Sequence, residues 1–358
     1  MTQFLIRRLL LTLPVMVGIL LVTFVITRLV PGDPCYVMLG EKATEATCED
    51  FDRRYGLDKS IPEQFVRYMF QLLQGNFGTS IKDQRPITTI IAERLPMTIE
   101  LTILAMLFAS ISGVVLGIIS AINRNSIVDT LTMIGANMGV SMPVFWLGLL
   151  LAYLFALVLK GTPFALPPSS RLTAGMSLPP LEKTWGLTDL NGLGSFIIGL
   201  LSHSALLNGI LTGNFALVGD ALRHLILPAM AVGTISLSVI ARMTRSSLLD
   251  VLGQDYIRTA RAKGLIFRTI IRKHALRNAL IPIVTIIGIQ TGGLLSGAVL
   301  TETIFSLPGV GSKMVEAILG RDYPVVQGFS VVIAFIFVFT NLIVDFSYAF
   351  LDPRIRLE

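Results

Sequence analysis

The chain has 358 residues, of which 53% are hydrophobic and only 15% are charged, and its formal net charge is +6. A soluble domain carries roughly 25% charged residues, so a water-soluble globule of this size is excluded, as is a disordered chain. Two cysteines are too few for a disulfide-rich scaffold. The composition predicts a polytopic membrane protein.

Six apolar stretches have the length of a bilayer-crossing helix, about 20 residues. They are Leu9–Val30, Thr98–Ile122, Leu131–Leu159, Leu222–Ala241, Ala279–Phe305 and Phe329–Phe350. The first follows Arg7 and Arg8 as a secretory signal would, but its length and the lack of a small-residue cleavage site favour an uncleaved span. A seventh stretch, Ser195–Leu217, is interrupted by polar residues and fits an interfacial or re-entrant helix. We expect an all-α fold with six transmembrane helices.

Charge assigns the segments between the spans to the two sides of the membrane. The 36 residues Arg242–Arg277 carry nine Lys or Arg and two acids, whereas Pro31–Met97 carries eight Lys or Arg and ten acids. Because basic loops stay in the cytoplasm, we predict a cytoplasmic loop at 242–278, extracytoplasmic loops at 31–97 and 160–221, and two cytoplasmic termini. The basic residues end apolar stretches rather than gather on a soluble module, so nucleic acid is not an expected partner.

These assignments divide the chain into an N-terminal transmembrane helix at 1–30, an extracytoplasmic loop at 31–97 and a transmembrane core at 98–358. Both cysteines, Cys35 and Cys48, fall in the extracytoplasmic loop. An oxidising compartment allows them to form a disulfide, and two unpaired thiols are the equal alternative, because sequence spacing carries no geometry.

No motif for bond chemistry is present. The chain lacks a phosphate-binding G-x-x-x-x-G-K-[ST], an H-E-x-x-H and a G-x-S-x-G. Its three histidines, His203, His224 and His274, fall on different predicted segments, which favours structural roles over a metal site. We expect no catalytic residue, no metal and no cofactor bound by this chain.

The basic cytoplasmic loop contains the most informative pattern. From Gln254 to Lys263 the residues are compatible with a helix, and Tyr256, Ala260 and Gly264 recur at four-residue intervals that place them on one side. Gly264 can take a positive φ and end this helix in a tight turn. A second helical pattern then leads directly into the fifth span. A short helix joined to a membrane helix fits force transmission from a soluble partner, and a basic helix lying on anionic headgroups explains the charge equally well.

Several segments resemble those of one family. Asp255-Tyr-Ile-Arg-Thr-Ala-Arg-Ala-Lys-Gly264, followed by His274-Ala-Leu-Arg-Asn-Ala279, is similar to the cytoplasmic coupling motif of binding-protein-dependent ABC importer permeases, and more narrowly of the B-type permeases for dipeptides and oligopeptides. Further similarities, in order, are Pro31-Gly-Asp-Pro34, Tyr55-Gly-Leu-Asp58, Gly75-Asn-Phe-Gly78, Arg94-Leu-Pro96, Arg242-Met-Thr-Arg-Ser-Ser247, Thr301-Glu-Thr-Ile-Phe305, Arg321-Asp-Tyr-Pro324 and Asp352-Pro-Arg-Ile-Arg356. Where the general motif opens with Glu-Ala-Ala, this chain has Arg258-Thr-Ala260, as is usual in the peptide branch.

The resemblance implies the type I ABC importer permease fold and a non-catalytic inner-membrane subunit that forms half of a translocation pathway. It also implies a second homologous permease, two ATPase subunits that hold ATP and Mg, and an extracytoplasmic substrate-binding protein. Its coupling segment maps to Gln254, Asp255, Tyr256, Arg258, Thr259, Ala260, Arg261, Lys263 and Gly264. The same family imports glutathione, nickel or oligosaccharides, which are the alternative substrates, and a self-sufficient secondary transporter is a third hypothesis that lacks an inverted repeat.

Polar residues within the spans are candidates for the substrate route. Such residues face the bundle interior or a wet cavity, and Gln290, Asn341 and Asp345 are the candidates here. For Glu100, Glu302 and Asp345, all near span ends, hydrogen bonding between helices or proximity to headgroups is the favoured alternative. Small residues at Gly288-x-x-x-Gly292 and Gly293-x-x-x-Gly297 suit close helix packing or a pathway wall.

Overall fold

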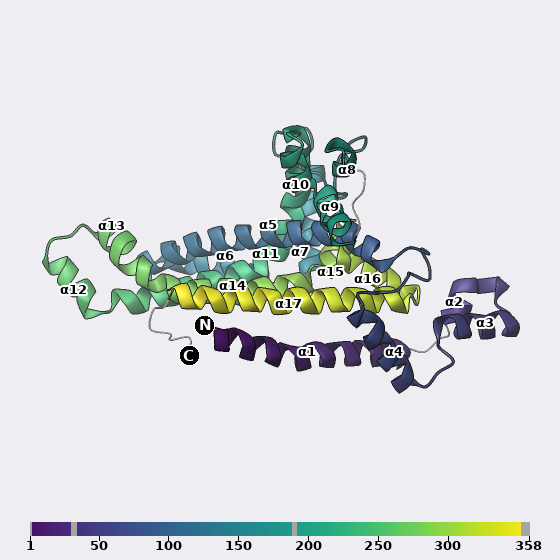
Figure 1. The fold of residues 1–358 in the computed structure, drawn as a ribbon. Coiled ribbons are helices and arrows are strands. Elements are labelled where there is room, and N and C mark those ends of the chain that lie inside the picture. The colour runs from purple at the N-terminus through teal and green to yellow at the C-terminus, as the bar shows by residue number, and fades with distance from the viewer. Residues whose placement is uncertain (1, 30–33, 188–191, 352–358) are drawn as a thin grey trace. The chain divides into compact units, whose positions relative to one another are not determined.

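The computed structural model describes residues 2–29, 34–187 and 192–351 (Figure 1). This described part is built from helices and turns, and one isolated antiparallel bridge joins Thr79 and Pro86.

The longer helices carry most of the apolar residues. They are α1 (Thr2–Leu29), α5 (Ile87–Ile122), α6 (Ile127–Ser141), α7 (Val144–Ala152), α11 (Phe215–Leu252), α14 (Leu276–Gly297) and α17 (Tyr323–Leu351). The shorter helices are α2 (Pro34–Leu39), α3 (Glu45–Tyr55), α4 (Ile61–Leu73), α8 (Leu181–Thr184), α9 (Leu193–His203), α10 (Ala205–Leu211), α12 (Asp255–Ala262), α13 (Phe267–Thr269), α15 (Val299–Ile304) and α16 (Val310–Leu319). A 3₁₀ turn occupies Gly40–Lys42, and π-helical turns occupy Tyr153–Val158 and Ile270–Ala275.

Five unbroken helices of the described chain have the length and hydropathy of a membrane span. They are Leu10–Leu29, Ile87–Ile122, Phe215–Leu252, Phe267–Leu294 and Tyr323–Ile343. The bent pair α6–α7, continued to Val158, supplies a sixth crossing, so the expected architecture of six transmembrane helices is confirmed. The expected interfacial stretch is the bent pair α9–α10, whose two helices meet at 96°.

The third span differs from the single helix expected over Leu131–Leu159. Its two helices meet at a bend of 107°. Met142 is extended, with ψ of 134°, and Pro143 precedes the first residue of α7. Proline lacks an N–H and disfavours helical geometry in the residue before it, so the chain cannot continue α6 through this dipeptide.

Other spans begin earlier than hydropathy indicates: α14 starts at Leu276 rather than Ala279, α17 starts at Tyr323 rather than Phe329, and α5 and α11 differ by seven residues or more. α5 starts at Ile87 rather than Thr98, and α11 starts at Phe215 rather than Leu222. The added first turns of α5 bury Ile87, Ile90 and Leu95. Packing against other parts of the protein stabilises these added turns. Hydropathy along the sequence does not reveal such packing.

The helices form two compact units. The first contains Met1–Met97, Leu178–Asn214 and Pro308–Val338, and the second contains Thr98–Ser177, Phe215–Leu307 and Phe339–Glu358. The linear division at residues 30 and 97 stays a prediction. Within the first unit, Cys35 and Cys48 form a disulfide with their Cα atoms 5.5 Å apart, which is the bonded state of the two alternatives.

The core of the second unit is centred on α11, which packs against α14, α6 and α7. Small residues let α5 come close to α11: a Cβ added at Gly113 would lie 2.9 Å from the Leu237 carbonyl oxygen, and one at Gly117 would lie 2.6 Å from that of Ala241. The tight small-residue motif is therefore Gly113-x-x-x-Gly117, which hydropathy did not single out. At Gly293, one of the glycines singled out from the sequence, an added Cβ would meet no atom within 4 Å.

Candidate functional site

The basic loop folds into a short helix that ends in a glycine turn. α12 begins at Asp255, whose carboxylate lies in the positive first turn of the helix. Gly264, just after the helix, has φ of +76°. Its N–H donates to the Arg261 carbonyl oxygen at 2.9 Å, and the Leu265 N–H donates to that of Ala260 at 3.3 Å. A left-handed residue is required here, which glycine adopts without steric cost.

α12 is anchored by one narrow face. Ile257 is fully buried and Ala260 is 7% exposed, and the helix contacts the π-helical turn Ile270–Ala275. The hydroxyl of Tyr256 accepts a hydrogen bond from Asn278 Nδ2 at 2.8 Å. The predicted stripe of Tyr256, Ala260 and Gly264 is thus only partly seen, because the helix ends before Gly264 and the buried pair has i, i+3 spacing.

The opposite face of α12 is a free, mostly basic surface. The side chain of Arg258 keeps 79% of its exposure and that of Asp255 keeps 94%, with 3.4 Å between their charged atoms. Arg261 lies over the Phe267 ring at 6.0 Å. Gln254, Thr259, Lys263 and Gly264 are exposed as well. An exposed pair of this kind contributes little to stability, which leaves these side chains available to a partner.

We call the segment Gln254–Gly264, which contains α12 and its end turn, the elbow. A nearly continuous helix connects this elbow to the fifth span. α13, the π-helical turn Ile270–Ala275 and α14 follow one another without a break. Ile270, Ile271 and Ala275 are buried. The segment from Phe267 to Gly297 is therefore one helical unit, which the turn at 263–266 joins to α12.

A buried ion pair that sequence reasoning missed holds the neighbouring helix ends together. Arg245 of α11 donates from Nε and Nη2 to the two carboxylate oxygens of Asp129 at 2.9 and 2.8 Å. Ser120 of α5 also donates to Asp129, as does the backbone N–H of Asn125 at 3.0 Å. Asp129 is 5% exposed. The bidentate geometry fixes α5, α6 and α11 near the base of the elbow.

The polar candidates within the spans have different surroundings. Gln290 of α14 donates from Nε2 to Ser236 Oγ of α11 at 3.2 Å. Asn341 is half-buried on α17. Asp345 lies on α17, but its side chain is outside the described residues. The structure brings Gln290 to α11, and a shared site of the three candidates stays a prediction.

Two acids near span ends are held by hydrogen bonds between segments. Glu302 is fully buried and accepts from Thr98 Oγ1 at 2.6 Å. Glu100 is 6% exposed and pairs with Arg171 Nη2 at 3.0 Å. The contact of Glu302 joins two helices, α5 and α15, as the favoured alternative expected, whereas Glu100 pairs with Arg171 of the loop between Val158 and α8.

Two of the three histidines have local partners. His203 Nδ1 lies 2.8 Å from the Gly199 carbonyl oxygen and His224 Nδ1 lies 2.9 Å from that of Asp220, each one helical turn back. In the described part of the chain, no group of three or more His, Cys, Asp or Glu side chains could hold a metal ion.

The described chain is an all-helical membrane bundle in which a short basic helix leads into one of the spans. This arrangement is that of a membrane-embedded transport subunit. Family comparisons make this more specific. Residues 113–357 match the model of the binding-protein-dependent transport system inner membrane component, and residues 1–102 match the model of the N-terminal part of such membrane components. The chain belongs to this family of multi-pass inner-membrane permeases of ABC importers.

Curated relatives match over the whole length. The dipeptide transport system permease protein DppB of Alkalihalophilus pseudofirmus is 45% identical, with 99% of this chain and all of the relative covered. The protein of the same name in Escherichia coli is 41% identical, with 99% of each covered. The glutathione transport system permease protein GsiC of Pectobacterium atrosepticum is 36% identical, with both chains fully covered. Family membership implies an ATPase and a substrate-binding protein as partners.

Proposed function

We propose that this chain is a permease subunit that imports dipeptides and short oligopeptides and forms half of the translocation pathway with a second, homologous permease. The relatives named above that share 41–45% identity are described as dipeptide permeases. Glutathione is the second candidate substrate, since a relative at 36% identity carries that description. Both substrates are small peptides with free carboxylates, so the same kind of pathway serves either.

The elbow at Gln254–Gly264 is the contact for the ATPases in this proposal. The observation that carries it is the geometry of α12, which is anchored through Ile257 and Ala260 and is exposed through its basic face. Closure of two ATPase subunits moves α12, and the continuous helix ahead of α14 turns this movement into a tilt of the spans. The alternative that α12 lies on anionic headgroups predicts no loss of transport when only its end turn is changed.

In this proposal, each kind of subunit in the complex has a separate task. ATP and Mg are held by the ATPase subunits, this chain binds no cofactor and catalyses no reaction, and an extracytoplasmic binding protein delivers the substrate. The elbow and both termini are cytoplasmic. Gln290, Asn341 and Asp345 are proposed to line the route, where a peptide's amides and charged ends need polar partners.

Substitution of Gly264 by valine tests the coupling role. A β-branched residue does not adopt φ of +76° without strain, so G264V misorients the turn after α12. We expect peptide uptake by the complete complex in vesicles to fall at least roughly tenfold, since about 1.4 kcal/mol of lost coupling suffices. The ATPases should still copurify with the permease.

The matched control is G253A, because Gly253 directly precedes the elbow and an added Cβ there makes only ordinary contacts at 3.5 and 3.8 Å. It should transport normally. Undiminished transport in a chain lacking Gln254–Gly264 would show that the elbow is not the coupling element. Which peptide the cognate binding protein retains, measured separately, decides between dipeptide and glutathione.

A further inference from the structure

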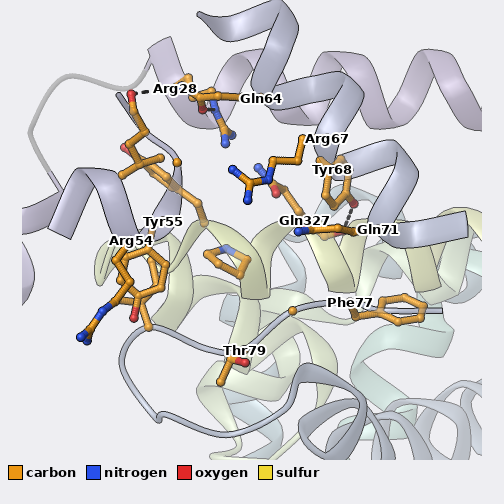
Figure 2. Close-up of a pocket in the computed structure, with 16 residues that line it drawn as sticks. Arg28, Arg54, Tyr55, Gln64, Arg67, Tyr68, Gln71, Phe77, Thr79 and Gln327 are labelled. Carbon is orange, nitrogen blue, oxygen red and sulfur yellow. Dashed lines mark hydrogen bonds between the residues drawn. The ribbon is translucent and has the colours of Figure 1, made fainter. Parts of the chain in front are cut away.

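A cavity rich in arginine lies in the first unit, at the end of α1. It has a volume of about 320 Å³ and is lined by Arg28, Arg54 and Arg67 together with tyrosine, glutamine and backbone groups (Figure 2). None of the described residues that line it is an Asp or a Glu, and none of its three arginines forms an ion pair with a described carboxylate. Within the part of the chain that the structure describes, the cavity is therefore a positive site lined by three guanidinium groups and no carboxylate.

Arg28 is held in place but is not satisfied. Its Nε donates to Gln64 Oε1 at 2.7 Å, and its guanidinium carbon lies 3.6 Å from the centre of the Phe24 ring. Gln64 is itself fixed by donating to the carbonyl oxygens of Leu57 and Lys59. The Nη1 atom of Arg28 is buried and has no hydrogen-bond partner among the described residues. A buried cationic donor without an acceptor is costly, and an anionic oxygen would remove that cost.

The other side chains add donors around the same space. Arg67 points into the middle of the cavity, and Arg54 extends along its edge (Figure 2). Burial raises the pKa of Tyr68, against the smaller opposing effect of Arg28, so its hydroxyl stays neutral. That hydroxyl lies 3.5 Å from the Gln327 carbonyl oxygen, and Gln327 Nε2 is a second buried donor that no described residue satisfies. Planar guanidinium groups bind phosphate and carboxylate oxygens in pairs.

α4 separates two kinds of surface. Gln64, Arg67, Tyr68 and Gln71, at i, i+3, i+4 and i+7, line the cavity. A second stripe of the same helix leaves apolar side chains bare, with Val66 67%, Phe70 63% and Leu73 82% exposed. α4 contacts α1, a membrane span whose Ile26 and Leu29 are also exposed. An amphipathic helix beside the end of a span lies in the headgroup layer with its apolar side in the acyl chains.

We infer that this cavity binds the phosphate headgroup of an anionic phospholipid. The arginines hold the phosphate, and the apolar stripe of α4 and the exposed end of α1 contact the glycerol and acyl carbons. A free phosphate would contact the arginines but not the apolar surface of α4 and α1. By the proposed topology, the lipid belongs to the outer leaflet of the inner membrane.

The test uses the full chain in nanodiscs of phosphatidylcholine doped with phosphatidylglycerol, and native mass spectrometry counts the phosphatidylglycerol retained. We expect R67Q to lower the apparent affinity for phosphatidylglycerol by roughly tenfold, the effect of losing one charge-assisted contact. R28Q should lower it further. R67Q keeps the test valid if R28Q fails to fold, because Arg67 is exposed.

R53Q is the matched control: Arg53 precedes Arg54 on α3 but does not line the cavity, and its Nε contacts only the Glu49 carbonyl oxygen. It should retain the lipid as the unchanged chain does. Unchanged retention in R67Q and R28Q, or equal loss in R53Q, overturns the inference. Equal binding of glycerol 3-phosphate in pure phosphatidylcholine assigns the site to a soluble phosphate instead. Displacement of the lipid by alanylalanine, but not by its amide, assigns it to a peptide carboxylate.

Discussion

At the scale of single residues, the ion pair Asp129–Arg245 is a contact whose loss should lower the free energy of unfolding. Asp129→Asn keeps the shape and a hydrogen-bond partner for Ser120 but leaves the Arg245 guanidinium without its counter-ion. Removing one member of a fully buried pair costs roughly 3–5 kcal/mol. Because the Arg245 side chain is 31% exposed, we expect about 2 kcal/mol, measured as a lower midpoint of thermal unfolding in detergent.

The exposed pair on α12 is the control for that measurement. Asp255→Asn removes the partner of Arg258 where the two side chains are 94% and 79% exposed. Solvent screening makes such a pair nearly worthless for stability, so D255N should unfold like the unchanged chain. An equal loss in D129N and D255N would mean that burial does not set the strength of the Asp129 contact.

A second residue-scale prediction concerns pH. Hydrogen bonding to Lys82 lowers the pKa of Glu316 from its ordinary value of 4.5, Lys313 acts in the same direction, and burial opposes both. A group with a lowered folded-state pKa stabilises the fold above its ordinary value, and this contribution is lost as pH falls below 4.5 through the folded-state value. Glu316→Gln should therefore remove part of the acid sensitivity of thermal unfolding, by at most about 1 kcal/mol.

The matched control for Glu316 is E63Q, since Glu63 is exposed at the start of α4 and has no ion pair among the described contacts. Unfolding of E63Q should keep the pH dependence of the unchanged chain below pH 4.5. If E316Q loses as much stability on acidification as the unchanged chain does, the Lys82–Glu316 contact does not contribute to that dependence.

At the scale of elements, the contact of α5 with α11 depends on an absent side chain. A Cβ at Gly117 would lie 2.5 Å from Thr244 Cβ and 2.6 Å from the Ala241 carbonyl oxygen, so backbone would have to move. Overpacking costs about 1–3 kcal/mol, which exceeds the gain of up to about 1 kcal/mol from alanine's helix propensity. G117A should lower the unfolding midpoint. G135A, where an added Cβ meets nothing within 4 Å, should leave it unchanged or raise it.

The same elements show what sequence can and cannot predict. Long apolar runs and the asymmetry of basic residues sufficed for six spans and for the elbow, because both signals are local in the chain. The break before Pro143 was missed, because the apolar run continues through it, although proline acts on its own neighbour and the signal is local. The pair Asp129–Arg245 could not be predicted, because 116 residues separate its members and only the packing of α6 on α11 brings them together. Likewise, the sequence alone does not distinguish Gly113 and Gly117, which lie against α11, from Gly293, beside which an added Cβ would meet no atom within 4 Å.

For the whole molecule, the number of crossings decides which surfaces share a compartment. From the disulfide segment to α12 the chain passes through α5, the α6–α7 pair and α11, which makes three crossings and opposite sides. Were α9–α10 also to cross, there would be four, and α12 would lie on the disulfide's side. At 1.5 Å per residue, the 11 residues of α9 and the 7 of α10 are together about 27 Å long even if laid end to end, short of the roughly 30 Å hydrocarbon core. The 15 residues of α6 and the 15 of Val144–Val158 together reach about 45 Å.

Labelling with a membrane-impermeant maleimide tests whether the disulfide segment and α12 lie on opposite sides of the membrane. The native disulfide does not react, so a cysteine introduced for exposed Gln74, which follows α4, and one for exposed Arg258 of α12 report separately. We expect Q74C to be labelled in spheroplasts and R258C only after permeabilisation, because a disulfide forms on the oxidising side and the basic elbow is retained on the other. T162C, in the second long outer loop, should behave as Q74C does. Labelling of R258C without permeabilisation would place α12 out of reach of any cytoplasmic ATPase, and the proposed coupling would fail with it.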